Sequence, residues 1–375
     1  MADRRTSAGL PTTRGPQCAS YPFRTPSIRT AADDRNQSVR HLASRPGDRS
    51  PHLLADGRGR HRRNARHALA WPGDGDQHLT SEASRSVLVE NHPERTPPVI
   101  AWLSPAARKA IVAVACQASD DQASCCEKGF EDVFVSDPSD PYYGFSSWDD
   151  FFTRRFVDGL RPVASGANAI ANACESAPLQ VVEDVAESDR FWLKGQPYSL
   201  LNMMGFDPLA SQFAGGTVYQ AFLNALSYHR WNSPVDGVVR KAHVVDGSYY
   251  LENRYAGFID PASADPSAPN DSQAFLTAVA TRAVIFIEAD DPKVGLMCFI
   301  AVGMAEVSSC EIRVHAGQRL ARGDELGMFH FGGSTHCLIF RPGVKLQFHF
   351  DRYHTKPGLD ATNVPVGAAV ATVVG

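Results

Sequence analysis

The stretch "DELGMFHFGGSTHCLIF", residues 324–340, consists of two apolar, strand-like segments joined by glycines and a serine. Apolar runs bounded by turn residues are typical of β-strands, so the stretch predicts a hairpin. Gly332 and Gly333 lack the Cβ atoms that would hinder a strained backbone, and the turn could press the Ser334 hydroxyl against the preceding carbonyl. An ordinary turn is the alternative, because Gly and Ser are common turn residues. The stretch therefore raises the question of whether the Gly333–Ser334 bond reacts.

Further segments around this hairpin have the β-type pattern of short apolar runs broken by Gly, Pro, Asn and Asp. They are "SPVDGVVRKAHVVDGSYYLE" (233–252), "AVIFIEAD" (283–290), "GLMCFIAVGM" (295–304), "CEIRVHAGQRLARGDELGMFHF" (310–331) and "HCLIFRPGVKLQFHF" (336–350). Helical signals precede them in the chain. We therefore predict an α+β fold in which a helical N-terminal portion is followed by a β-rich core.

Two helices are predicted in the N-terminal portion. In "LSPAARKAIVAVACQA" (103–118), a serine is a suitable N-cap and a proline occupies the first helical position. In "SSWDDFFTRRF" (146–156), Ser147 is the expected cap, and Arg154 and Arg155 are expected in the last turn. The aromatic residues of the second helix fall at helical spacing and should form one apolar face, namely Trp148, Phe151, Phe152 and Phe156.

Composition limits the classes of function. The chain has 375 residues, 43% of them hydrophobic, and a net charge of −4, which argues against a nucleic-acid-binding protein. Its eight cysteines show no metal-ligand spacing, so we expect reduced thiols, no metal and no disulfide framework. No apolar run is long enough to cross a bilayer and no secretory signal is visible, which predicts a cytoplasmic protein with at most peripheral membrane contact.

Residues 1–80 differ from the rest of the chain. The first 70 residues carry fourteen arginines, no lysine and no apolar period, which predicts a disordered Arg-rich tail. Such a tail could contact anionic lipid or nucleic acid, and a solvated tail without specific function is the simpler interpretation. We expect a helical segment at 81–136 and a β-rich domain at 137–375.

Three motifs occur in the order and spacing of the phosphatidylserine decarboxylase family. They are "WDDFFTRRFVDGLRPV" (148–163), "YHRWNSPVDGVV" (228–239) and "GDELGMFHFGGSTHCLIF" (323–340), and together they make the chain resemble this family over residues 145–375. The "HFGGST" form and the sequence Cys-Glu-Ser at 174–176 are similar to the branch that includes fungal L-tryptophan decarboxylases.

The resemblance implies a self-processing, pyruvoyl-dependent decarboxylase, cleaved into two chains at the Gly333–Ser334 bond. Ser334 would attack the Gly333 carbonyl, and elimination and hydrolysis would leave a pyruvoyl group at position 334. That group forms a Schiff base with the substrate amine and accepts electrons as CO2 leaves, so no external cofactor is expected. The resemblance leaves two substrates open, phosphatidylserine and free L-tryptophan or another amino acid.

The resemblance also indicates the base. His229 matches the first histidine of a His-x-x-His motif and has a side chain suited to proton transfer near neutral pH. Asn232 replaces the second histidine, and an amide cannot shuttle protons. His229 therefore serves both steps, or another histidine substitutes. His336 is the best substitute, because residues two apart on a strand share a face with Ser334.

Glu175 matches the acidic residue of the family and would orient the imidazole, as a carboxylate does in a serine triad. An exposed loop glutamate is the alternative, and Asp236 is the second choice for the acid. Trp231 and Tyr228 flank His229 and could be core aromatics or a wall against which an aromatic substrate packs.

These expectations leave some options open. A pseudoenzyme or binding protein could retain the fold without activity, and a lipoyl-type carrier barrel is a weaker alternative because its hairpin tip would carry a lysine. The expected partners are the small-molecule or phospholipid substrate and the two cleavage chains themselves, with a homodimer left open and no nucleic acid.

Overall fold

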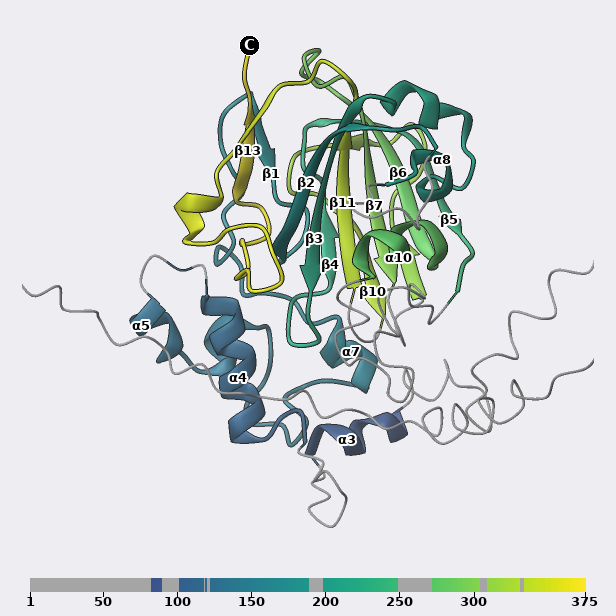
Figure 1. Ribbon diagram of the computed structural model, residues 1–375. Coiled ribbons are helices and arrows are strands. Elements are labelled where there is room, and N and C mark those ends of the chain that lie inside the picture. Colours follow the sequence, from purple (N-terminus) through teal and green to yellow (C-terminus); the bar gives the residue numbers. More distant parts are fainter. Residues whose placement is uncertain are drawn as a thin grey trace, which may run out of the picture. The chain divides into compact units, whose positions relative to one another are not determined.

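The structure is a computed structural model that describes residues 82–89, 101–117, 119, 122–188, 198–248, 272–303, 309–330 and 334–375 (Figure 1). The predicted tail at 1–80 and both glycines of the Gly-Gly-Ser-Thr turn lie outside the described residues. Of the described residues, 108–135 and 153–375 form one compact unit, and 82–107 and 136–152 form another.

Both predicted N-terminal helices are present, although the second is shorter than expected. Helix α4 (Pro105–Cys116) begins after Ser104, whose Oγ accepts a hydrogen bond from Ala107 N at 3.3 Å. Helix α7 (Trp148–Phe152) is capped by Ser147, whose Oγ accepts from Asp150 N at 3.0 Å. The expectation that Arg154, Arg155 and Phe156 belong to this helix is wrong. The chain is extended beyond α7, and Phe156 forms an isolated β-bridge with Phe134.

The remaining short elements of the N-terminal part are the 3₁₀ helix η2 (Glu82–Arg85) and helices α3 (Ser86–Val89), α5 (Gln122–Cys126) and α6 (Phe130–Val133). Later in the chain lie α8 (Leu200–Met203), α10 (Gln273–Val279), η3 (Pro208–Phe213) and η4 (Phe350–Tyr353). Strands dominate the rest of the larger unit, and the predicted α+β class is confirmed.

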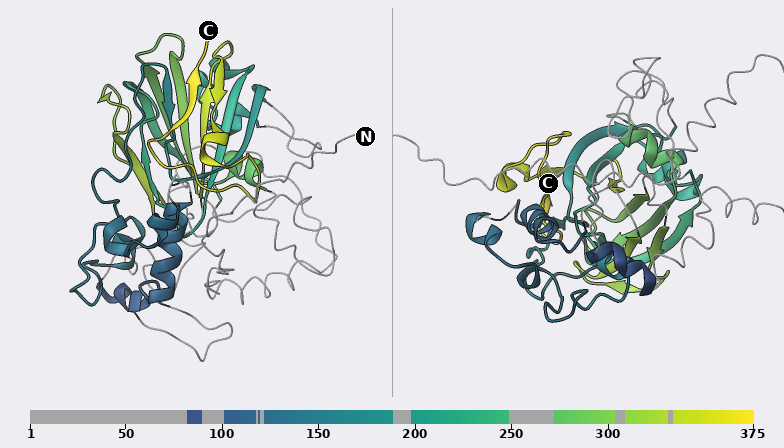
Figure 2. Two further views of the ribbon diagram at one scale, coloured as in Figure 1. Left: turned by 90° about the vertical axis from the view of Figure 1, so that its left-hand side faces the viewer. Right: turned by 90° about the horizontal axis from the view of Figure 1, so that it is seen from below.

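An antiparallel sheet of seven strands forms the centre of the larger unit (Figures 1 and 2). Its order is β2 (Ala177–Val185), β3 (Gly216–Leu223), β11 (Ser334–Phe340), β7 (Leu296–Gly303), β6 (Arg282–Ala289), β5 (Gly237–Val245) and β9 (Arg319–Leu320). A second sheet joins β4 (Arg230–Asn232), β10 (Glu325–His330) and β8 (Ser309–Ile312), and a third joins β1 (Ala169–Ala171), β13 (Ala369–Val373) and β12 (Leu346–Phe348). Strand β11, which begins at Ser334, is therefore central.

The two faces of the seven-stranded sheet bury different side chains. One face, here called the aromatic face, contributes to a core that includes Tyr219, Phe299, Leu338 and Phe340. The opposite face, here called the helical face, is covered by α8 and α10 (Figure 1) and buries Cys337 and Ile339 of β11 among other apolar residues. Because side chains alternate along a strand, each residue of β11 belongs to one of these two faces.

Candidate active site

Ser334 is the first residue of β11 and is held on both sides by the sheet. It lies opposite Leu223 of β3 and Gly303 of β7. The residue is fully buried, and its Oγ has no hydrogen-bond partner among the described residues. A buried hydroxyl without a partner typically costs about 1–3 kcal/mol.

His336 lies on the same face of β11 as Ser334. Its ring packs at 5.9 Å from the Tyr219 ring and 6.0 Å from the Phe299 ring, measured between centroids, which places it on the aromatic face. Both ring nitrogens are buried without a hydrogen-bond partner in the described part of the chain. Burial lowers the pKa of His336 to about 3, because the charged form loses its hydration. This imidazole is therefore neutral near pH 7.

His229 lies between strands β3 and β4 in the sequence and contacts strand β10 through its main chain. The residue is fully buried. Its carbonyl accepts a hydrogen bond at 2.9 Å from Phe329 N, and Phe329 belongs to the strand that leads into the turn. In sequence, His229 shortly follows Leu223, the residue that faces Ser334 across the ladder. The β3–β4 connection thus brings the main chain of His229 next to strand β10, which precedes Ser334 in the sequence.

The connection before His229 is fixed by a buried guanidinium. Arg154 Nη2 donates to Leu226 O at 2.6 Å and to Ser227 O at 3.1 Å. Burial lowers the pKa of Arg154 to about 9, which leaves it charged near neutral pH. Tyr228, the neighbour of His229, stacks on Phe156 with 4.5 Å between ring centroids. Arg154 therefore acts on the His229 loop, and its predicted place at a helix end was wrong.

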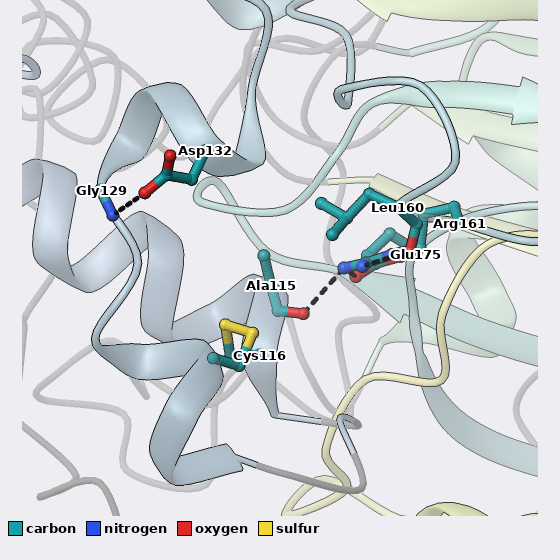
Figure 3. Close-up of a disulfide and its surroundings, with 8 residues drawn as sticks. Ala115, Cys116, Gly129, Asp132, Leu160, Arg161 and Glu175 are labelled. Atoms are coloured by element: carbon teal, nitrogen blue, oxygen red, sulfur yellow. Dashed lines mark hydrogen bonds and ion pairs between the residues drawn. A yellow bond between two sulfur atoms is a disulfide. The ribbon is translucent and has the colours of Figure 1, made fainter.

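Glu175 is buried, so the alternative of an exposed loop residue is wrong. Its carboxylate accepts two hydrogen bonds from Arg161, from Nε at 3.0 Å and from Nη2 at 2.6 Å (Figure 3). Val366 N donates to the same carboxylate at 2.8 Å. Arg161 also lies over the Phe156 ring, 4.1 Å from its centroid, and that ring stacks on Tyr228. Glu175 thus belongs to a packed cluster that reaches the neighbour of His229.

A disulfide lies next to this cluster and corrects the expectation of reduced thiols throughout. Cys116 at the end of α4 is bonded to Cys125 in α5, with 5.6 Å between the Cα atoms (Figure 3). The carbonyl oxygen of Ala115, the residue before Cys116, accepts a hydrogen bond from Arg161 Nη2 at 2.7 Å. The disulfide joins the end of α4 to α5, and nothing in the cysteine spacing indicated this pairing.

The remaining predicted residues have structural contacts. Asn232 Nδ2 donates to Gly323 O at 2.7 Å, which links β4 to the segment before β10. Asp236 accepts hydrogen bonds from Arg322 N at 2.9 Å and Nη2 at 3.1 Å. The hydrogen bond from the Arg322 amide, helped by the guanidinium, holds the pKa of Asp236 below its usual value. Asp236 therefore fixes a loop.

Trp231 is fully buried on the aromatic side. Its ring lies 5.7 Å from that of Phe299 and 5.0 Å from that of Phe329. A Cβ atom at Gly327 would lie 2.8 Å from the Trp231 ring and 2.1 Å from Glu311 O, so this glycine permits the close approach of β4, β8 and β10. Trp231 is therefore a core aromatic residue.

The described part of the chain contains neither a metal-binding group of side chains nor a membrane-spanning helix. Their histidine, cysteine, aspartate and glutamate residues form no group that could hold a metal ion. No helix within the described ranges is long and apolar enough to cross a bilayer.

Comparison with known proteins places this geometry in a family. The family model described as phosphatidylserine decarboxylase matches residues 148–370, which include Glu175, His229 and Ser334. The chain belongs to the phosphatidylserine decarboxylase family.

Named relatives within this family differ in their substrates. The chain is 48% identical over 233 residues to "Decarboxylase iboD" of Amanita muscaria, covering 59% of this chain and 66% of the relative. It is 40% identical over 238 residues to an L-tryptophan decarboxylase of Psilocybe cubensis, covering 62% of this chain and 54% of the relative. It is 28% identical over 216 residues to phosphatidylserine decarboxylase proenzyme 3 of Schizosaccharomyces pombe, covering 57% of this chain and 21% of the relative. The chain thus spans at most 66% of the length of these three relatives.

Proposed function

We propose that this chain is a self-processing, pyruvoyl-dependent decarboxylase that cleaves itself between Gly333 and Ser334. The observation that carries the proposal is the fully buried Ser334 Oγ without a hydrogen-bond partner among the described residues, at the start of the central strand. In the proposed reaction, this hydroxyl attacks the carbonyl of the preceding residue. The products would be chains 1–333 and 334–375.

The proposed cleavage needs a base and a rigid turn. His229 takes the proton from Ser334 Oγ as the oxygen bonds to the Gly333 carbonyl carbon. The amide C–N bond then breaks and an ester replaces it. Loss of the Ser334 α-proton expels the Gly333 carboxylate, and water replaces the remaining nitrogen, which leaves as ammonia. Since Asn232 replaces the second histidine of the motif, one imidazole would serve both cleavage and turnover.

Ser334 suits the pyruvoyl group because the group keeps the Cα and Cβ atoms of that residue and adds no bulk to a packed sheet. Once formed, it supplies the electron sink for decarboxylation that pyridoxal phosphate supplies in other enzymes. The aromatic face would keep water from the reacting carboxylate, and His229 would return a proton to the substrate carbon after CO2 leaves.

The substrate we propose is a free amino acid with an aromatic side chain, such as tryptophan. The support is the difference in sequence identity. The chain is 40% identical to an L-tryptophan decarboxylase and 28% identical to a phosphatidylserine decarboxylase proenzyme. Phosphatidylserine remains the competing substrate within the same chemistry.

Intact-mass spectrometry and CO2 release test the proposal together. The wild type should give two chains, whereas Ser334→Ala should give one uncut, inactive chain. Ser199→Ala is a matched control because Ser199 is also fully buried, with its Oγ bonded to Asn202 at 2.7 Å, and this variant should still cleave. Carboxyl-labelled tryptophan, other labelled amino acids and phosphatidylserine vesicles then distinguish the substrates. An uncut wild type would instead favour a binding protein that retains the fold.

A further inference from the structure

Four polar side chains and one main-chain carbonyl on the helical side of the sheet form a buried hydrogen-bond network, here called the Gln220 network. It consists of Gln180 on β2, Tyr198 before α8, Gln220 on β3, the main chain of Gln273 on α10, and Thr335 on β11. Gln220 Nε2 donates to Thr335 Oγ1 at 3.0 Å and to Gln273 O at 3.1 Å. Tyr198 donates to Gln220 Oε1 at 2.5 Å and accepts from Gln180 Nε2 at 2.6 Å.

The centre of the network is fully satisfied and fully buried. The amide of Gln220 uses both N–H groups and its oxygen, and Thr335 Oγ1 donates to Ala221 O at 2.8 Å while it accepts from Gln220. Gln220, Tyr198 and Thr335 have no exposed surface. Buried polar networks of this kind hold their members in one arrangement, because each alternative rotamer would leave a buried donor or acceptor unpaired.

Thr335 is the residue that follows the proposed nucleophile. Its side chain points to the helical face, whereas Ser334 and His336 point to the aromatic face. Fixing the Thr335 side chain on one face therefore fixes the rotation of the strand about its own axis, and with it the direction of Ser334 Oγ on the other face.

We propose that Gln220 and Thr335 are positioning residues for the reaction at position 334, an inference that rests on the proposed self-cleavage. Before cleavage, the network fixes the direction of Ser334 Oγ from the opposite face of the strand. After cleavage, residue 334 becomes the first residue of a new chain, and chain termini fray unless they are tied down. The Thr335 hydroxyl ties that terminus to β3, from the face that does not contact substrate.

The test compares three threonine variants of the full chain. Thr335→Val keeps the shape and removes both hydrogen bonds of Oγ1, and we expect self-cleavage to slow by about 10- to 100-fold, the usual effect of a misplaced reacting group. Thr335→Ser keeps the hydroxyl, and this variant should cleave at the wild-type rate. Thr277→Val is the matched control, since Thr277 is fully buried and its Oγ1 donates to Ala274 O at 2.6 Å within α10.

Cleavage rates are measured by mass spectrometry on folded protein, with thermal unfolding in parallel. Thr335→Val should lose more stability than Thr277→Val, because it removes two buried hydrogen bonds and not one, and only Thr335→Val should slow cleavage. Gln220→Met is a second variant for the case in which Thr335→Val does not fold. It should slow cleavage, and in the cleaved protein it should speed amide hydrogen exchange at residues 335–337. Wild-type cleavage rates in Thr335→Val or in Gln220→Met would overturn the positioning role alone. A wild type that never cleaves would overturn the proposed function as well.

Discussion

Replacing Arg161 with methionine should destabilise the protein strongly, because it leaves the Glu175 carboxylate buried without its cation. The side chains of the pair are only 14% and 2% exposed. Methionine retains the apolar stem but removes both hydrogen bonds to Glu175 and the bond to Ala115 O. Removing one partner of a buried ion pair typically costs about 3–5 kcal/mol, which sets the expected loss of unfolding free energy.

The measurement is urea unfolding at pH 7 in the Ser334→Ala background, in which the protein should remain a single chain. Arg319→Met is the matched control, since Arg319 pairs with Asp290 at the surface, where the side chains are 66% and 41% exposed. A surface pair contributes about 0–1 kcal/mol, so this control should unfold almost as the parent does. Adding Glu175→Gln to Arg161→Met should recover part of the loss, because a neutral amide is less costly to bury. Equal losses in the two arginine variants would refute the buried pair.

Three further outcomes are expected. His229→Ala should abolish self-cleavage whereas His336→Leu should retain it, as gels of the purified variants would show, and the reverse result would make His336 the base. Burial alone would raise the pKa of Asp207, but hydrogen bonds from Lys241 and a main-chain amide lower it below its usual value. Its stabilising contribution is thus complete above about pH 4 and is lost as pH falls through the lower folded pKa, so Asp207→Asn should weaken the acid dependence of urea unfolding. Deleting residues 1–80 should leave cleavage and turnover intact, and loss of folding on deletion would contradict the predicted disordered tail.

The sequence predicted the strands that are apolar along most of their length. Strands β5, β6, β7, β10 and β11 were all expected. The expected hairpin at residues 324–340 is wrong, because β10 pairs with β4 and β8 whereas β11 pairs with β3 and β7 in a different sheet. Strands β2 and β3 were not, and both carry a glutamine within the strand. Gln180 and Gln220 interrupt an apolar pattern, and they are tolerated because they bond to Tyr198 and to each other across the sheet. Such pairing depends on tertiary contacts that no single segment encodes.

The site was also predictable only where local geometry was sufficient. The period of two along a strand was sufficient to place His336 on the face of Ser334, because that inference uses only local geometry. The burial of Glu175 depends on Arg161, on Val366 and on the end of α4, which are far apart in the sequence. The alternative that Glu175 is an exposed loop residue was wrong, because the local sequence does not show which segments cover a loop.

The surroundings of His336 bear on the proposal that His229 is the base. On the aromatic face, His336 is surrounded by aromatic rings, and its pKa of about 3 keeps it neutral near pH 7. A neutral imidazole of such low basicity neither takes a proton readily from a serine nor holds one for the product. His229 lies instead on a connection fixed by the Arg154 guanidinium and followed by strand β4. We therefore propose that the sheet presents Ser334 while the β3–β4 connection presents the base, and the His229→Ala and His336→Leu variants test this assignment.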